Sequence, residues 1–179
     1  MSDSTKKIVA IIGSASPTSN TAKIVNATLG DLGARDVEID VIDPTRLTLP
    51  LPGQTVENAD TEAIQALVSG ADGLIISTPE YHGSYSSVIK LIIDNLGYPS
   101  TMKDKPVALI GVAAGVLGAT KALEHLRSTL SHVGAFVLPS VVSVAAIHKA
   151  FNEDGSLADD GLQERLAKQN TALLDFIRR

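Results

Sequence analysis

The segment IVAIIGSASPTSNTAK, residues 8–23, joins an apolar run to a polar loop and then to a helical pattern. Residues 8–12 are all apolar, which is typical of a strand buried on both faces of a parallel sheet. Serines, threonines and Pro17 mark a turn, and residues 20–33 show helical periodicity closed by a glycine. The segment therefore predicts a strand, a loop and a helix, the first unit of an α/β fold.

Four other stretches predict strands. Residues 73–77, 107–112 and 136–144 are apolar runs like the first. Residues 36–43 instead alternate between apolar and polar side chains, which indicates a strand at an edge of the sheet with one face partly exposed. Pro139 cannot donate a hydrogen bond to a neighbouring strand, so the last strand is also expected at an edge, or to contain a bulge.

Helical patterns fill the gaps between these strands, around Ile64 and Leu67, over residues 86–96, from Ala119 to Leu130, and from Leu162 to Ile177. Regular alternation of strands and helices predicts a three-layer, doubly wound parallel sheet of five strands. With the second and fifth strands at the edges, the order is 2-1-3-4-5, the flavodoxin-like arrangement. Ligands bind such sheets beyond the carboxyl ends of the strands, so the loops after the first, third and fourth strands are the candidate sites.

The length of 179 residues fits one domain, which we expect over residues 7–179 after a short disordered tail at residues 1–6. The net charge of −5 comes from interspersed acids and bases, which argues against nucleic acid or an anionic membrane as a partner. Cysteine is absent, which excludes disulfides and thiolate chemistry and fits a reducing compartment. Because residues 8–12 are too few for a signal sequence or a membrane span, we expect a cytoplasmic protein.

The loop after the first strand combines hydroxyl side chains with the start of a helix. Free backbone N–H groups and partial positive charge at such a start suit an anion, and one phosphate fits better than a nucleotide triphosphate or a dinucleotide. On its own, however, the loop is more typical of a turn at Pro17 with Ser19 or Asn20 as helix cap than of a phosphate site.

The loop after the third strand begins TPEYHGSYSS, residues 78–87. It could present backbone amides and flat rings to a planar ligand, or be a proline turn with exposed tyrosines. Glu80 and His82 are close enough in sequence for acid–base chemistry, but no third group completes a hydrolytic triad. The other histidines, His125, His132 and His148, lack clustered carboxylates, and we expect no metal site.

GSASPTSNT follows the first predicted strand, PEYHGSYSSVIKLIIDNL the third and GVAAGVLGATKALEHLR the fourth. In this order, spread over nearly the whole chain, they resemble the NADPH-dependent FMN reductase family of the flavodoxin-like superfamily. The resemblance implies an enzyme with FMN as cofactor, and hydride transfer from NADPH or NADH to the flavin. Electrons then pass to a small acceptor such as free flavin, a quinone, an azo compound or a metal oxyanion. The chemistry belongs to the cofactor, so we name no catalytic side chain.

The resemblance also implies which residues bind the cofactor. Side chains of the first loop would hold the FMN phosphate: Ser14, Ser16, Ser19, Asn20 and Thr21. The second motif would line the isoalloxazine ring: Pro79, Glu80, Tyr81, His82, Gly83 and Ser84. The third would close over the ring's pyrimidine side: Ala114, Gly115, Val116, Leu117 and Gly118.

Two residues depart from the family pattern. Ser16 stands where many relatives carry an arginine, a plausible partner for the extra phosphate of NADPH, so the choice between NADPH and NADH stays open. His82 replaces the usual asparagine. If that residue contacts the flavin through its main chain, little changes; if through its side chain, the hydrogen bonding and potential of the flavin differ.

Apolar residues cover a wide arc of the helix at residues 86–96, wider than packing on a sheet requires, which indicates either contact with another subunit or a deeply buried helix in a monomer. The resemblance to the family favours the first and implies a homodimer or homotetramer through this helix. The long connection at residues 43–58 also suggests an interface or a site rim. A flavodoxin-type electron carrier without small-molecule turnover is the alternative function. The low aromatic content of 3%, with no tryptophan, is evidence against it. A phosphoacceptor domain would need aspartates after the first strand, where none stands.

Overall fold

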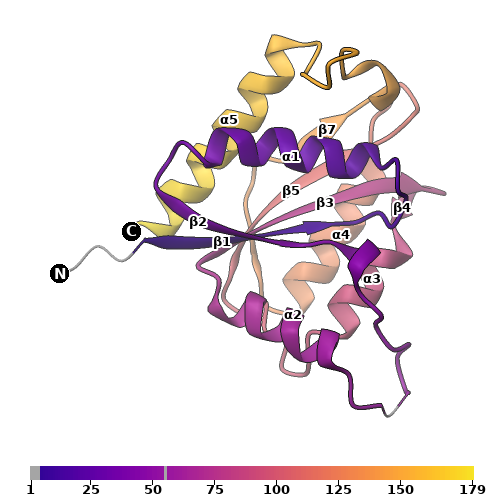
Figure 1. The fold of residues 1–179 in the computed structure, drawn as a ribbon, viewed down its shortest axis with the longest axis vertical. Helices are drawn as coiled ribbons and strands as arrows, with labels where there is room; N and C mark the ends of the chain where they lie inside the picture. Colours follow the sequence, from indigo (N-terminus) through magenta and orange to yellow (C-terminus); the bar gives the residue numbers. More distant parts are fainter. Residues whose placement is uncertain (1–4, 55) are drawn as a thin grey trace.

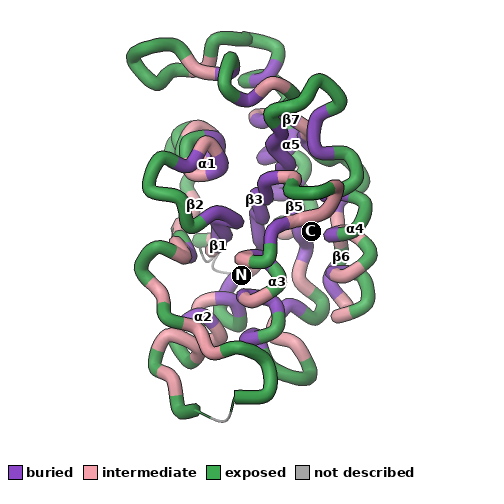
Figure 2. Tube along the Cα trace, turned by 90° about the vertical axis from the view of Figure 1, so that its right-hand side faces the viewer, coloured by how far each residue is buried: buried purple, intermediate pink, exposed green. Residues whose placement is uncertain are grey.

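The computed structural model describes residues 5–54 and 56–179 as three layers (Figure 1). A sheet forms the middle layer. Helices α1 (Asn20–Leu32) and α5 (Asp160–Ile177) cover one face. Helices α2 (Ala59–Gly70), α3 (Ser87–Asp94) and α4 (Thr120–His132) cover the other. Each face has its own buried apolar cluster, and the buried residues follow the central strands between the helices (Figure 2).

The parallel strands of the sheet are β1 (Lys6–Ile12), β2 (Val37–Ile42), β3 (Gly73–Tyr81), β5 (Pro106–Val112), β6 (Phe136–Val137) and β7 (Val142–Val144). Their order is β2-β1-β3-β5-β6, and β7 also pairs with β5. This confirms the predicted doubly wound, flavodoxin-like fold, with the alternating strand β2 at one edge.

The last predicted strand, residues 136–144, is broken into β6 and β7, and Pro139 lies in the gap. Arg127 of α4 compensates for the interrupted pairing, because its guanidinium donates hydrogen bonds to the carbonyl oxygens of Leu138 at 3.0 Å and of Pro139 at 3.1 Å. The proline therefore interrupts an edge of the sheet, as predicted.

The third strand is longer than predicted. We expected it to end at Ser77, but β3 continues to Tyr81 and turns back into β4 (Ser84–Tyr85). Pairing with β5 supports the extension as far as Pro79. His82 and Gly83 occupy the turn with φ angles of 51° and 73°, and a two-residue hairpin with both central φ positive is the type I′ turn. The expected loop is thus a tight hairpin.

Residues 43–58, apart from residue 55, are fastened to the ends of α2 and α3. Asn95 Nδ2 donates to Pro50 O at 3.1 Å, and Asn58 Nδ2 donates to Thr48 O at 2.8 Å. A short 3₁₀ turn, η1 (Pro44–Arg46), opens the segment. The segment's apolar side chains at Leu47 and Leu49 pack against the cluster beneath α2 and α3, so this part of the segment covers core.

The expected N-terminal tail, residues 1–6, falls outside the described residues at positions 1–4, while Lys6 already belongs to β1 and pairs with Val37. In the part of the chain that the structure describes, no helix combines the length and the apolar character needed to cross a membrane.

Candidate functional site

A cleft of about 320 Å³ opens at the carboxyl ends of β1, β3 and β5. The chain leaves β1 toward β2 on one side, and β3 lies on the other side, so the crossover connections diverge at this edge. Segments far apart in sequence meet here. The lining residues are Ser14, Ser16, Thr18, Ser19, Asn20, Thr21, Pro79, Glu80, Tyr81, Val112, Ala113, Ala114 and Ile147.

A larger cavity, about 780 Å³, lies where α3 and α4 end, with Tyr98, Lys103 and His132 in its lining. Both helices begin beside the cleft and run away from it, so this cavity is remote from the carboxyl edge of the sheet. Its lining includes none of the residues expected to bind the cofactor, and the smaller cleft is therefore the candidate site.

The first loop leaves β1 in close contact with β3. Gly13 N donates to Ser77 O at 2.8 Å. A Cβ at position 13 would overlap that carbonyl oxygen and lie 2.7 Å from Ile89 Cγ1. On the other side, Ser86 Oγ donates to Gly13 O at 2.6 Å. Only glycine fits this approach, and the start of the loop is therefore fixed.

Ser19 is the N-cap of α1 and accepts a hydrogen bond from Ala22 N at 3.1 Å. The cap hypothesis is thus correct for Ser19, but the cap does not use up the donors of the loop. Among the described residues, the backbone N–H groups of Ala15, Ser19, Asn20 and Thr21 have no hydrogen-bond partner. Free amides at the positive end of a helix form a site for an anion.

The hairpin places neighbouring side chains on opposite faces. Because side chains alternate along β3, Pro79 and Tyr81 lie on the face toward α1, and Glu80 lies on the face toward α4. Glu80 Oε2 accepts a hydrogen bond from Ala122 N, in the first turn of α4, at 3.0 Å. The carboxylate that we expected beside a bound ring is therefore engaged by a helix.

Two more polar contacts fasten the returning strand β4 to the same helix. Ser84 Oγ lies 3.1 Å from His125 Nδ1, and Tyr85 OH lies 3.0 Å from Thr129 Oγ1. His125, although exposed, therefore contacts the hairpin. The hairpin and α4 form one rigid corner of the cleft.

The third loop, residues 113–119, is tied to the segment that contains β7. Ala113 N donates to Val144 O at 2.9 Å, and Ala119 N donates to Ser143 Oγ at 2.9 Å. Gly118 has a φ of +70°, and a Cβ there would overlap Ser143 Oγ. A side chain at position 118 would thus separate the loop from β7.

Comparison with known proteins identifies the family of this chain. Residues 6–149 match the sequence pattern of a family described as NADPH-dependent FMN reductase. The chain belongs to this family. Membership confirms the predicted enzyme class, an FMN-using NAD(P)H oxidoreductase, over the electron-carrier alternative.

Relatives of the FMN reductase family cover nearly the whole chain. An FMN-dependent NADPH-azoreductase of Staphylococcus aureus (strain USA300) is 30% identical over 176 residues, 93% of each protein. An NADPH azoreductase of Bacillus sp. (strain OY1-2) is 36% identical over 115 residues, 63% of this chain and 62% of that protein. The solved structure of FerB, a flavoenzyme NAD(P)H:(acceptor) oxidoreductase from Paracoccus denitrificans, has a TM-score of 0.80 and 26% identity over 97% of both chains.

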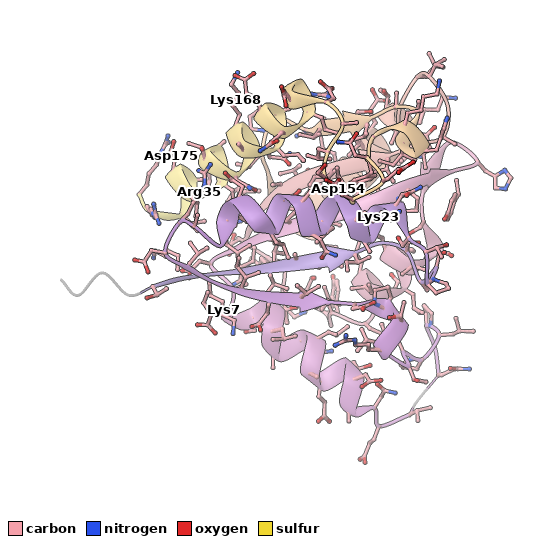
Figure 3. The ribbon with its side chains drawn as sticks, turned by 45° about the horizontal axis from the view of Figure 1, so that its top comes forward. Lys7, Lys23, Arg35, Asp154, Lys168 and Asp175 are labelled. Atoms are coloured by element: carbon pink, nitrogen blue, oxygen red, sulfur yellow. The ribbon has the colours of Figure 1, made fainter. Side chains whose placement is uncertain are left out.

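The cleft fits the FMN that the family uses. FMN carries one phosphate and one flat ring, and the cleft offers free amides and hydroxyls on one wall and the hairpin on another. No lysine or arginine stands at residues 13–22. The next residue, Lys23, lies in α1 (Figure 3). Its Nζ is 5.7 Å from the centroid of the Phe151 ring. The wall formed by the first loop therefore offers neutral donors.

The structure brings together most, but not all, of the predicted residues. The following line the cleft: Ser14, Ser16, Ser19, Asn20, Thr21, Pro79, Glu80, Tyr81 and Ala114. The following lie in the same segments without lining it: His82, Gly83, Ser84, Gly115, Val116, Leu117 and Gly118. Sequence reasoning missed Thr18, Val112, Ala113 and Ile147. Thr18 lay inside the quoted loop, whereas Ile147 follows β7 and carries no signal in the sequence.

Proposed function

We propose that this cleft binds FMN, with the terminal phosphate on residues 14–21 and the isoalloxazine ring beside the hairpin and the loop at residues 113–119. One observation carries the proposal: free amides at the start of α1 open into the same cleft as Pro79 and Tyr81. When bound, FMN accepts a hydride from NADPH or NADH and passes electrons to a second molecule.

The first loop binds and neutralises the phosphate. The side chains of Ser14, Ser16, Asn20 and Thr21 line the cleft and add donors to the backbone amides. The helix terminus supplies the balancing positive charge that a lysine or arginine supplies elsewhere. This arrangement selects a phosphate ester over an uncharged alcohol.

The hairpin and the third loop orient the ring. Both are held by hydrogen bonds within the protein, so the ring-binding surface exists before the ligand arrives and costs little ordering entropy. Val116 and Leu117, at the tip of the loop, are 86% and 87% exposed. We propose that these two apolar side chains shield the ring edge from water.

The acceptor that this site suits is a small, flat, conjugated molecule: a free flavin, a quinone or an azo compound. Such a molecule stacks on the open face of a flavin without a dedicated pocket, and the named relatives include azoreductases and an acceptor oxidoreductase. Ser16 provides no positive charge for the extra phosphate of NADPH. We therefore expect NADH to serve as well as NADPH.

Absorbance spectroscopy tests this function. The purified protein is titrated with FMN, and the complex is then mixed anaerobically with NADH or NADPH, followed by a quinone or an azo dye. We expect FMN to bind, its visible absorbance to bleach with either nucleotide, and the acceptor to restore it. A protein that takes up no FMN contradicts the proposal, and FMN that stays oxidised with both nucleotides restores the electron-carrier alternative.

We also propose a homodimer or homotetramer through the helix at residues 86–96. Most of its apolar residues are buried within the subunit, but Val88 and Leu91 are only half-buried, and the nearby Tyr98 is fully exposed. Sedimentation should show an oligomer that Leu91→Glu dissociates; a monomeric wild type would contradict this.

A cytoplasmic location, supported by the absence of cysteine, is testable by cell fractionation.

A further inference from the structure

Helix α4 begins without a cap from its own segment. Its N-cap residue, Ala119, has no side-chain oxygen to accept a hydrogen bond from the first turn. The acceptor comes instead from the hairpin, because Glu80 Oε2 lies 3.0 Å from Ala122 N. A carboxylate at a helix N-terminus makes a charge-assisted hydrogen bond and opposes the partial positive charge there.

This contact joins two walls of the cleft. Glu80 belongs to the extended end of β3, beside Pro79 and Tyr81. Ala122 lies in the first turn of α4, which follows the loop at residues 113–119. The small residues Ala113 and Ala114 of that loop also line the cleft. The loop has anchors at Val144 and Ser143 on the β7 side, and the Glu80 contact fixes the helix into which it runs.

We propose that Glu80 is a positioning residue: its carboxylate caps α4 and so fixes the gap between the hairpin and the loop at residues 113–119 to the width of the flavin ring. This inference rests on the proposed function, because it assigns the ring to that gap. The carboxylate acts through α4 and not through contact with the ring. The contact requires an oxygen acceptor at the right reach, and the negative charge strengthens it.

Two conservative variants separate the effect of side-chain length at position 80 from the effect of its negative charge. Glu80→Gln keeps the chain length and an oxygen acceptor but removes the charge. Glu80→Asp keeps the charge but shortens the side chain by one methylene and withdraws it from Ala122 N. Glu80→Ala removes both. Glu124→Ala is the matched control, because Glu124 is an exposed carboxylate on the same helix outside the cleft.

Two measurements are made on each variant: amide hydrogen exchange of residues 113–122 in the FMN-free protein, and FMN affinity by fluorescence titration. Loss of a charge-assisted bond is expected to raise the FMN dissociation constant about tenfold in Glu80→Ala and Glu80→Asp. Exchange at Ala122 should accelerate in the same two variants. Glu124→Ala should stay near wild type in both measurements, and Glu80→Gln should lie much closer to wild type than Glu80→Ala does.

The inference is overturned if Glu80→Asp behaves like wild type while Glu80→Gln behaves like Glu80→Ala, because the charge would then act directly. It is also overturned if exchange at Ala122 is the same in all variants. Exchange is measured without FMN, so it decides whether Glu80 holds α4 even if wild type binds no flavin. A wild-type protein that binds no flavin would contradict the proposed function, and also the proposal that the ring lies between the hairpin and the loop at residues 113–119.

Discussion

Ser86 Oγ donates a 2.6 Å hydrogen bond to the carbonyl oxygen of Gly13 and accepts one from Ile89 N at 3.2 Å. One buried hydroxyl thus caps α3 and holds the start of the loop after β1. Ser86 N also donates to Thr78 Oγ1 at 3.1 Å, which adds β3 to the same junction. The conformation of the loop after β1 therefore depends on a residue that lies outside the cleft lining.

Ser86→Ala should lower the free energy of unfolding by about 2 kcal/mol, because it removes a helix cap and leaves a buried carbonyl without its donor. Urea denaturation measures the change. Ser87→Ala is the control, since Ser87 is exposed and next in sequence. An equal free energy of unfolding for the two variants would show that the hydrogen bonds of Ser86 do not stabilise the fold.

Gly13→Ala should destabilise the protein by about 2 kcal/mol or more, because the added methyl group overlaps Ser77 O and crowds Ile89. Gly30→Ala is the matched control. Gly30 lies within α1, and a Cβ there meets nothing within 4 Å. That variant should be more stable by about 0.5 to 1 kcal/mol, since alanine favours the helix. Thermal unfolding in which both variants shift in the same direction would contradict the packing argument.

Ser19→Asp should separate the cap from the phosphate site. Aspartate is as good an N-cap as serine, so the melting temperature should hardly change. Its charge would stand beside the FMN phosphate and should weaken FMN binding by roughly tenfold or more. Ser19→Asn, a neutral cap, is the control and should bind FMN like wild type. Undiminished FMN affinity in Ser19→Asp would place the phosphate elsewhere.

Riboflavin lacks the phosphate and should bind about a hundredfold more weakly than FMN, because it forgoes several charge-assisted hydrogen bonds to the first loop. Its affinity should be insensitive to Ser19→Asp. Competition of the two flavins, followed by fluorescence, measures both. Comparable binding of riboflavin and FMN would mean that the free amides of the loop contribute nothing.

The fold was largely predictable because its signals are local. Apolar runs such as residues 8–12 predict buried strands, and Pro139 breaks the last strand where its chemistry requires. The extension of β3 through Pro79 was not predictable, because a proline beside polar residues has no strand signal of its own; pairing with β5 and packing on α4 hold it there.

Residues of the candidate site that belong to a sequence motif were predictable. Residues that reach the cleft only because of the fold were not. The serines of the first loop line the cleft as expected. Glu80 lines the cleft as well, but its carboxylate faces α4. Its direction follows from the alternation of side chains along the extension of β3, which was not predicted. His82 has a positive φ in its turn. Histidine and asparagine both tolerate positive φ better than most residues, so either fits this position. Ile147 enters the cleft only through the fold.

A crystal structure of the protein grown with FMN tests the central claim most directly. We predict the phosphate within hydrogen-bond distance of the backbone N–H groups of Ser19, Asn20 and Thr21, and the ring between Tyr81 and Ala114. Flavin density in the larger cavity at the ends of α3 and α4, or a phosphate away from residues 14–21, would contradict it.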